Sequence, residues 1–264
     1  MPTLVLTDAS RRNVALFRNF FLRELSSRYL GSVVGLAWAL LHPLALLGVY
    51  YLVFTQIFRV TGLGGTSFLA FVAVALWPWL AAQEALQRGT PSIAAYAGLV
   101  RKVAFPHEIV VYASVAATFV IHFAGYVLVL GVLTAVGEPV RLAGLVLALP
   151  LWLVLALAIT GVSLALAALQ VFVRDVEHVL MPVLMVLMYL TPILYPLTLV
   201  PQGLRGFVTV NPLTWLVTRL RDTLLEGRFE LHAGDLVAAA FACALFGAGR
   251  WVFRRLSPQF EDFV

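Results

Sequence analysis

The longest uncharged stretch of the sequence, LAGLVLALPLWLVLALAITGVSLALAALQVFV (residues 142–173), decides the fold class. A helix that crosses the hydrocarbon core of a bilayer needs ~20 mostly apolar residues, and this stretch is longer than that. In the strands of a membrane β-barrel, polar residues alternate with apolar ones. This stretch shows no such alternation. The stretch therefore predicts a membrane-spanning α-helix.

Similar stretches lie on both sides of residues 142–173. In the whole chain 62% of residues are hydrophobic and 12% are charged, whereas ordinary globular domains are roughly half apolar and a quarter charged. We predict an all-α integral membrane protein that forms a single transmembrane domain over residues 1–264. Arg250, near the end of the last span, is expected to reach toward the lipid headgroups. The six predicted spans cover residues 33–58, 67–87, 107–136, 142–173, 178–197 and 234–253.

The basic residues favour an orientation with both termini in the cytoplasm, because Lys and Arg near the ends of spans are retained on that side. The first 28 residues contain five arginines and no small-residue cleavage site, so we expect no signal peptide. The net charge of +5 then reflects topology and does not indicate nucleic-acid binding. Twelve of the eighteen basic residues fall on the cytoplasmic side of a six-span chain: Arg11, Arg12, Arg18, Arg23, Arg28, Arg88, Arg101, Lys102, Arg174, Arg250, Arg254 and Arg255.

Residues 10–30, before the first span, have the pattern of an amphipathic helix at the cytoplasmic membrane interface. Val14, Phe17, Phe21 and Leu25 recur at spacings of three and four residues. The helix either anchors the chain to anionic lipids or brings its arginines to a lipid substrate that carries phosphate. The residues predicted to meet such a headgroup are Arg18, Arg23, Arg28 and Tyr29.

Residues 90–102, between the second and third predicted spans, predict a short cytoplasmic helix. Thr90 is a suitable N-cap and Pro91 suits the first helical turn, while Pro106 stops the chain before the next span. We expect this helix to have little to pack on within its own chain. It either docks a soluble partner or rests on the membrane surface.

Residues 198–230 form the outer connection between the last two spans and are predicted to be a gate segment. Asn211 and Pro212 are the cap and first turn of a helix, and Gly227 ends it. This helix is too short to cross the bilayer, so we expect it to be re-entrant or interfacial at the outer mouth. Its apolar stripe consists of Leu213, Leu216, Leu220 and Leu224.

Motifs for catalysis or metal binding are missing from the sequence, and we predict no catalytic residues, no metal and no cofactor in this chain. The phosphate loop of an ATPase requires Gly-Lys followed by Ser or Thr, but the only lysine, Lys102, follows an arginine and precedes a valine. Four polar residues in or near the spans are expected to lie at different depths: His42, Glu84, His122 and Asp235.

Four short motifs occur in a fixed order along the chain. They are RYLGS (28–32), LVRKVAFP (99–106), Arg174-Asp175 ahead of TPILYP (191–196), and Asn211-Pro212. Together they resemble the membrane subunits of ABC-type polysaccharide exporters, which move capsule, O-antigen or teichoic acid chains. The resemblance implies a homodimer of six-span subunits that joins two copies of a separate cytoplasmic ATPase, which binds ATP and Mg.

The resemblance also implies roles for individual residues. The N-terminal helix would meet the lipid-linked end of the glycan, and the outer segment would shape the exit. Family members form their pathway between two subunits, so Trp38, Trp77 and Tyr195, together with Tyr29, are predicted to line it. The residues predicted to couple to the ATPase are Thr90, Pro91, Arg101, Lys102, Phe105, Pro106, Arg174 and Asp175.

On these grounds the chain is expected to be the permease subunit of an exporter of lipid-linked polysaccharide in the bacterial inner membrane, with capsular polysaccharide favoured. O-antigen or teichoic acid, and drug or small-lipid cargo for a related ABC permease, are the alternatives in the same fold. An intramembrane enzyme acting on lipid-linked sugar and a channel gated without ATP are the alternatives outside it. Expected contacts include membrane lipids and periplasmic or outer-membrane export proteins, and exclude nucleic acid.

Overall fold

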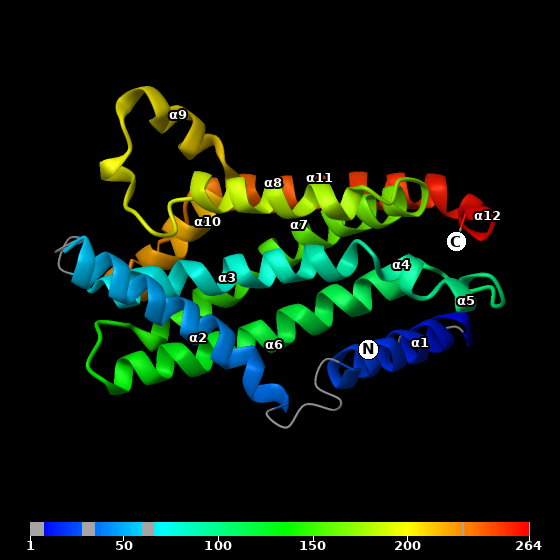
Figure 1. Cartoon of the computed structure of the whole chain (residues 1–264), viewed down its shortest axis with the longest axis horizontal. Helices are drawn as coiled ribbons and strands as arrows, with labels where there is room; N and C mark the ends of the chain where they lie inside the picture. The colour runs from blue at the N-terminus through cyan, green and yellow to red at the C-terminus, as the bar shows by residue number, and fades with distance from the viewer. Residues whose placement is uncertain (1–7, 28–34, 60–65, 229, 264) are drawn as a thin grey trace, which may run out of the picture.

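The computed structural model describes residues 8–27, 35–59, 66–228 and 230–263. Arg28 and Tyr29 therefore lie outside the described residues, and their predicted role at the lipid headgroup stays a prediction. The described residues form helices and turns, with no β-strand among them. The long helices run side by side along one axis of the molecule (Figure 1). The all-α prediction is confirmed for this part of the chain.

Five stretches of the described chain are long and apolar enough to cross a membrane. The predicted fifth span, 178–197, is instead the shorter helix α8 (Val176–Leu190), which ends in the extended residue Thr191. Proline disfavours the helical conformation in the residue before it, and Pro192 follows Thr191. At ~1.5 Å per residue α8 alone falls short of the ~30 Å hydrocarbon core. The five stretches are Leu40–Ile57, Phe68–Gly89, Glu108–Ala135, Leu142–Phe172 and Ala233–Phe263.

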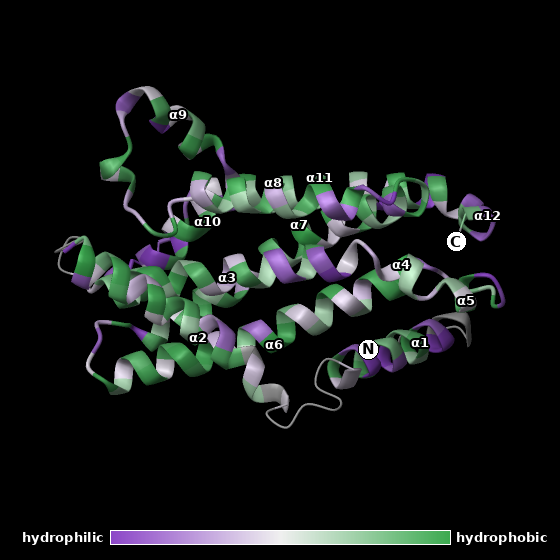
Figure 2. Cartoon of the chain, in the orientation of Figure 1, coloured by the Kyte–Doolittle hydropathy of each residue, from purple (hydrophilic) through white to green (hydrophobic). Residues whose placement is uncertain are grey.

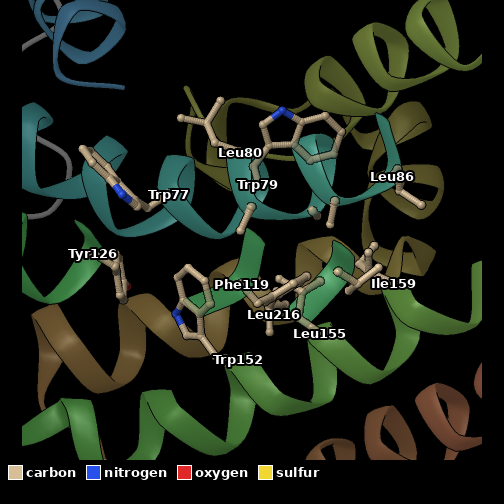
Figure 3. Close-up of a cluster of buried hydrophobic side chains, with 14 of the residues drawn as sticks. Trp77, Trp79, Leu80, Leu86, Phe119, Tyr126, Trp152, Leu155, Ile159 and Leu216 are labelled. Carbon is tan, nitrogen blue, oxygen red and sulfur yellow. The ribbon is translucent and has the colours of Figure 1, made fainter. Parts of the chain in front are cut away.

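Helix α3 (Phe68–Gly89) lies in the centre of the bundle and packs on α6 (Glu108–Ala135) and α7 (Leu145–Phe172). Seventeen of its 22 residues are buried, as expected for a helix that is apolar on all sides. Around it the rings of Tyr126 and Trp152 lie 5.1 Å apart (Figure 3), and the Tyr126 hydroxyl donates to the carbonyl of Val74. This aromatic layer holds α3 between its two neighbours.

Helix α11 (Ala233–Leu256) packs along α7 at backbone contact distance. A Cβ atom on Gly161 would collide with the backbone of Leu245 and Phe246, and one on Gly249 would collide with the backbone of Gly161. Small residues permit such close approach of membrane helices. The two helices therefore pack with no side chain between them at this point.

The remaining elements lie at the two ends of the bundle or beside it (Figure 1). We call one end the α5 end, where α4 (Ser92–Ala95), α5 (Ala97–Val100), α12 (Phe260–Phe263) and the turn between α7 and α8 lie. The opposite, α10 end carries α10 (Pro212–Arg221) and the turn between α6 and α7. Figure 2 shows hydrophilic residues on α1, on α12 and in the loop after α5, with hydrophobic residues over most of the helices between the ends.

Three further helices and six short helical turns complete the described chain. Helix α1 (Asp8–Ser27) packs against α6, and α2 (Trp38–Tyr51) continues into a π-helical turn, η2 (Leu52–Ile57). Helix α9 (Gln202–Val210) stands out from the bundle near the α10 end (Figure 1). Short 3-10 or π-helical turns are η1 (Gly35–Ala37), η3 (Leu142–Gly144), η4 (Leu197–Leu199), η5 (Asp222–Glu226) and η6 (Ser257–Gln259).

Candidate functional site

Thr90 does not cap a cytoplasmic helix, so that prediction is wrong. It keeps helical torsion angles at the end of α3, and its backbone N–H donates to the carbonyl of Leu86 over 3.0 Å. Its side chain is fully buried, which removes it from any docking surface. Pro91 precedes α4 and makes no side-chain cap. Helix α3 continues beyond the apolar residues of the second span and ends at Gly89.

The predicted helix over residues 90–102 consists of two short helices that meet at Tyr96. The Tyr96 ring packs on Phe20 of α1 at 5.2 Å, and its hydroxyl donates to Glu24 over 3.2 Å. Ile93 and Val100 are buried. The expectation that this segment has little to pack on in its own chain is wrong. Burial is the larger cause that raises the pKa of Tyr96, and the nearby Glu24 carboxylate raises it further.

The predicted apolar stripe of α1 is confirmed in part. Phe17, Phe21 and Leu25 are half-buried, whereas Val14 is 56% exposed. The most buried residue is Phe20, which lies outside the stripe and stacks on Phe105 at 5.8 Å. Periodicity could not show that α1 packs on α6 and on Phe105. Arg18 and Arg23 are exposed, and the Arg23 guanidinium lies over the Tyr96 ring, 5.0 Å from its centre.

Most of the residues predicted to couple to an ATPase lie together at the α5 end. Arg101, Lys102 and Pro106 are exposed in the loop that follows α5, and Arg174 and Asp175 are exposed in the turn between α7 and α8. Both segments lie at the same end of the bundle (Figure 1). The end of the molecule therefore presents a charged surface made from two separate parts of the chain.

Gln170 holds the turn between α7 and α8 in place. Its side-chain amide donates to the carbonyl of Arg174 over 3.2 Å, and its side-chain oxygen accepts from the backbone N–H of Glu177 over 3.0 Å. Gln170 itself is buried. The exposed residues of the turn thus sit on a backbone that is fixed from inside the bundle.

Sequence reasoning missed a charge cluster on Glu108, the first residue of α6. Its carboxylate pairs with Arg254 at 2.5 Å and with Arg250 at 3.1 Å, and it accepts from the Tyr112 hydroxyl over 2.9 Å. Arg250 was expected to reach toward headgroups, but it joins α11 to α6. The four-residue spacing of the two arginines places them on one helix face, which was the available signal.

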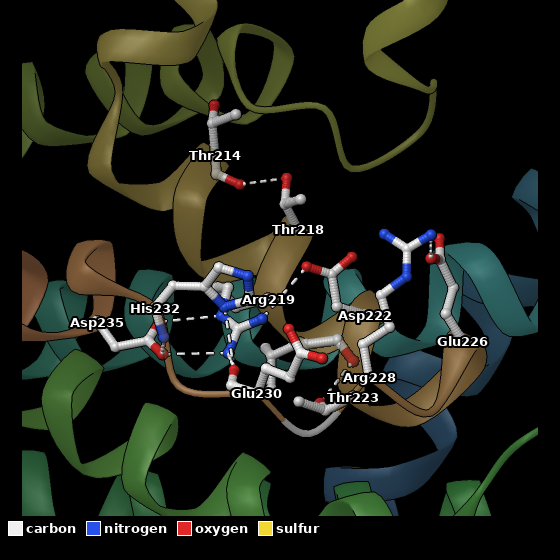
Figure 4. Close-up of polar contacts among 11 residues, drawn as sticks. Thr214, Thr218, Arg219, Asp222, Thr223, Glu226, Arg228, Glu230, His232 and Asp235 are labelled. Atoms are coloured by element: carbon white, nitrogen blue, oxygen red, sulfur yellow. Dashed lines mark hydrogen bonds and ion pairs between the residues drawn. The ribbon is translucent and has the colours of Figure 1, made fainter.

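At the α10 end, Arg219 connects α10 to the start of α11 (Figure 4). Its guanidinium donates to both carboxylate oxygens of Asp235, at 2.9 and 3.1 Å, and to the carbonyl of Glu230 at 2.7 Å. The same carboxylate accepts from the backbone N–H of His232 over 2.9 Å. This bidentate pair is a geometry that arginine provides and lysine does not.

Arg221 connects α10 to two other parts of the chain. It is buried and donates to the carbonyls of Phe71, Pro192 and Ile193 at 3.2, 2.7 and 2.8 Å. Its guanidinium lies 3.3 Å from the centre of the Phe71 ring. Burial lowers the pKa of Arg221 to about 9, which still leaves it charged at neutral pH.

The predicted cap of the outer helix is confirmed. The Asn211 side chain accepts from the backbone N–H of Leu213 over 3.0 Å and donates to Thr191 over 2.9 Å. Gly227 ends the helical segment with a φ of +70°, as expected for a C-terminal glycine. In the predicted stripe Leu216, Leu220 and Leu224 are buried and Leu213 is half-buried.

The chain matches a known protein family over most of its length. Residues 15–225 match the family described as ABC-2 type transporter. The chain belongs to this family. It is 29% identical over 247 residues to the O-antigen export system permease protein RfbA of Myxococcus xanthus. These residues cover 92% of each chain.

Two further relatives of this ABC-2 chain are named for O-antigen export and for polysialic acid transport. The O-antigen export system permease protein RfbA of Klebsiella pneumoniae is 27% identical over 243 residues, or 92% of each chain. The polysialic acid transport protein KpsM of Escherichia coli is 24% identical over 208 residues, or 78% of this chain and 80% of the other.

The residues predicted to line a pathway in this ABC-2 chain are not brought together. Trp77 has no exposed surface and packs in the core against α6, so it does not line a surface of the chain. Trp38 is 53% exposed in the first turn of α2. Tyr195 donates to the carbonyl of Tyr189 over 2.6 Å and borders a pocket of about 460 Å³ beside α9.

The polar residues of the spans are partly paired, contrary to expectation. The Glu84 carboxylate lies 2.8 Å from Nε2 of His122 and 2.6 Å from Nε of Arg88, so Glu84 and His122 lie at the same depth. Asp235 pairs with Arg219, and His42 is exposed. Among the described residues, no group of three His, Cys, Asp or Glu residues could hold a metal ion.

Proposed function

We propose that this chain is the permease subunit of an ATP-driven exporter that carries a lipid-linked polysaccharide across the bacterial inner membrane. Membership of the ABC-2 family and relatives named for O-antigen export over 92% of the chain support this proposal. The observation that carries it is the exposed charged surface at the α5 end, where Arg101, Lys102 and Arg174 lie. This surface offers a docking site for the separate ATPase.

The proposed arrangement places the α5 end and both termini in the cytoplasm. Helix α8 and the TPILYP segment that follows it together make a sixth crossing, which reaches the α10 end. Two copies of the chain assemble with two copies of the ATPase, which binds ATP and Mg. Four exposed apolar side chains offer a surface on α8 for the second copy: Met181, Met185, Val186 and Tyr189.

For the cargo we propose a lipid-linked O-antigen chain, with capsular polysaccharide as the second candidate. The relatives named for O-antigen export cover 92% of this chain, whereas the polysialic acid transport protein covers 78%. The exposed Arg18 and Arg23 on α1 suit the phosphate group of a lipid anchor in either class. Deletion of the gene tests the choice: loss of O-antigen from the cell surface with capsule retained supports the first candidate, and the reverse supports the second.

The docking proposal is tested by purification of the tagged chain from native membranes. An ATPase subunit in equal amount is expected. The double variant Arg101→Glu, Lys102→Glu should lose it, because the substitutions reverse the charge of the proposed surface. Arg205→Glu, which reverses an exposed charge on α9 near the opposite end, is the matched control and should retain it. Retention of the ATPase by the double variant with full export would contradict the docking assignment.

A further inference from the structure

Phe260 is the buried residue that anchors the C-terminal helix α12. After α11 the chain turns through η6 and enters α12, where Phe260 has no exposed surface. The last residues of most chains are poorly ordered unless they dock on the rest of the protein. Phe260 makes that docking contact, and its ring lies 5.3 Å from Phe253 of α11 in a perpendicular arrangement.

The same ring reaches both parts of the charged surface at the α5 end. It stacks on His107, one residue after the exposed Pro106, with ring centres 6.1 Å apart. It also lies 6.1 Å from Phe172, two residues before Arg174. Helix α12 therefore bridges the loop after α5 and the turn between α7 and α8.

The outer side of α12 is charged and exposed. Glu261 and Asp262 are exposed, and Phe263 is 56% exposed while its ring packs on Phe172 at 4.8 Å. An aromatic group surrounded by charged residues is a common composition for a protein interface. The carboxylates also add negative charge beside a surface whose other exposed groups include Arg101 and Lys102.

We propose that α12 is a third part of the ATPase-docking surface, anchored by Phe260 and offering Glu261, Asp262 and Phe263 to a basic patch of the ATPase. This inference rests on the proposed function. The proposed docking surface continues onto α12, because α12 contacts both segments that form that surface. The exposed side of α12 is negatively charged, whereas the loop after α5 is positively charged. Phe260 is a positioning residue in this scheme, because it is buried and acts through its neighbours.

Cysteine accessibility tests this inference on the full-length protein. The chain has one cysteine, Cys243, so a Cys243→Ser background allows one new thiol at a time. The three variants are Asp262→Cys on α12, Lys102→Cys in the loop after α5, and Arg228→Cys at the α10 end. Each is treated with a membrane-impermeant maleimide with and without the ATPase that co-purifies with the chain. Thiol modification requires exposure, so we expect labelling at the first two positions to become about tenfold slower with the ATPase.

The three positions separate the possible outcomes. Protection of Asp262→Cys and Lys102→Cys, with Arg228→Cys unchanged, supports the inference. Protection of Lys102→Cys alone overturns the inference and leaves the docking proposal intact. Protection of neither position overturns both.

A second measurement addresses the role of Phe260. Phe260→Ala should weaken association with the ATPase, and Phe260→Tyr, which keeps an aromatic ring at this position, should restore most of it. Trp251→Ala is the matched control, because Trp251 is a 68% exposed aromatic residue on α11. If Phe260→Ala bound the ATPase as tightly as wild type while Asp262→Cys also stayed unprotected, α12 would have no part in docking. Charge reversal by Glu261→Lys and Asp262→Lys repeats the binding test without removing a buried group.

Discussion

The two ends of the bundle use basic residues in opposite ways. At the α5 end, Arg101, Lys102 and Arg174 are exposed, and the segments that carry them are held by aromatic contacts and by the buried Gln170. At the α10 end, Arg219 and Arg221 are buried and bonded to carboxylate and carbonyl groups of the same chain. An arginine that is buried and bonded within its own chain is therefore no evidence for a docking surface. Only the exposed arginines of the α5 end leave their charge for a partner protein.

Removal of Arg221 should have the largest effect on stability. Arg221→Ala leaves the carbonyls of Pro192 and Ile193, which lie outside the helices, without their donor. Each unsatisfied buried polar group costs about 1–3 kcal/mol, so we expect a loss of about 3 kcal/mol or more. Thermal unfolding of the purified protein in detergent measures this loss. Arg221→Lys should recover only part of it, because lysine cannot donate to three carbonyls in one plane. A change as small as that of the exposed control Arg205→Ala would mean that the carbonyls find other donors.

Arg219 should rank second. Removal of either partner of the Arg219–Asp235 pair frees the start of α11 from α10, at a cost of about 2 kcal/mol. A double-mutant cycle with Arg219→Ala and Asp235→Ala isolates the pair and should return a coupling energy of about 1–2 kcal/mol. Full additivity of the two single changes would show that the pair contributes nothing.

A smaller, pH-dependent effect is expected at His107. Burial against Phe260 and Phe105 lowers its pKa below the ordinary value of 6.5, and the nearby Glu261 carboxylate opposes the shift. Because the unfolded state binds the proton more readily, stability at this end is fully present above pH 6.5 and falls as the pH drops below it. Hydrogen exchange of α12 amides measured across this range should show the loss.

The variant His107→Gln provides the control for that experiment. It removes the titrating ring, so the exchange of α12 amides should no longer speed up below pH 6.5 beyond the intrinsic dependence of exchange on pH. A pH dependence that survives in His107→Gln would place its origin in another group, with Glu261 as the first to test.

The smallest effect on stability is expected for the exposed charges of the α5 end. Arg101→Glu with Lys102→Glu should change the free energy of unfolding by no more than about 0.5 kcal/mol, as is usual for surface positions. The same variant should nevertheless lose the ATPase. Loss of stability comparable to that of Arg219→Ala would remove the distinction between the two ends.

Local signals in the sequence predicted local structure well. The uncharged runs located all five stretches that are long enough to cross a membrane. The bounds agree within two residues for three of them, whereas the last stretch continues ten residues beyond the predicted end at 253 and the first is compared only in its described part. Asn211 with Pro212 predicted the start of α10, and Gly227 predicted the end of the helical segment that continues from α10 through η5. These features depend on residues within a few positions of one another, so the sequence contains what is needed to find them.

Features that depend on contacts between distant elements were predicted poorly. The buried face of α1 centres on Phe20 because of Tyr96 and Phe105, which are more than 70 residues away. Trp77 was expected at a surface, yet its position in the core depends on Gly125 of α6. Arg219 and Arg221 carried no signal beyond their charge, because the sequence does not show which carbonyl or carboxylate faces a guanidinium.

The close contact between Gly161 and Gly249 affects how displacement travels through the molecule. Since no side chain separates α7 from α11 at this point, the backbones of the two helices are in direct contact. Helix α11 bears Asp235, the partner of Arg219, in its first turn, and Phe260 follows its last turn. At ~1.5 Å per residue these points are more than 30 Å apart. A rigid-body tilt of α11 would therefore move Asp235 and Phe260 together, so one helix joins the two ends of the bundle mechanically.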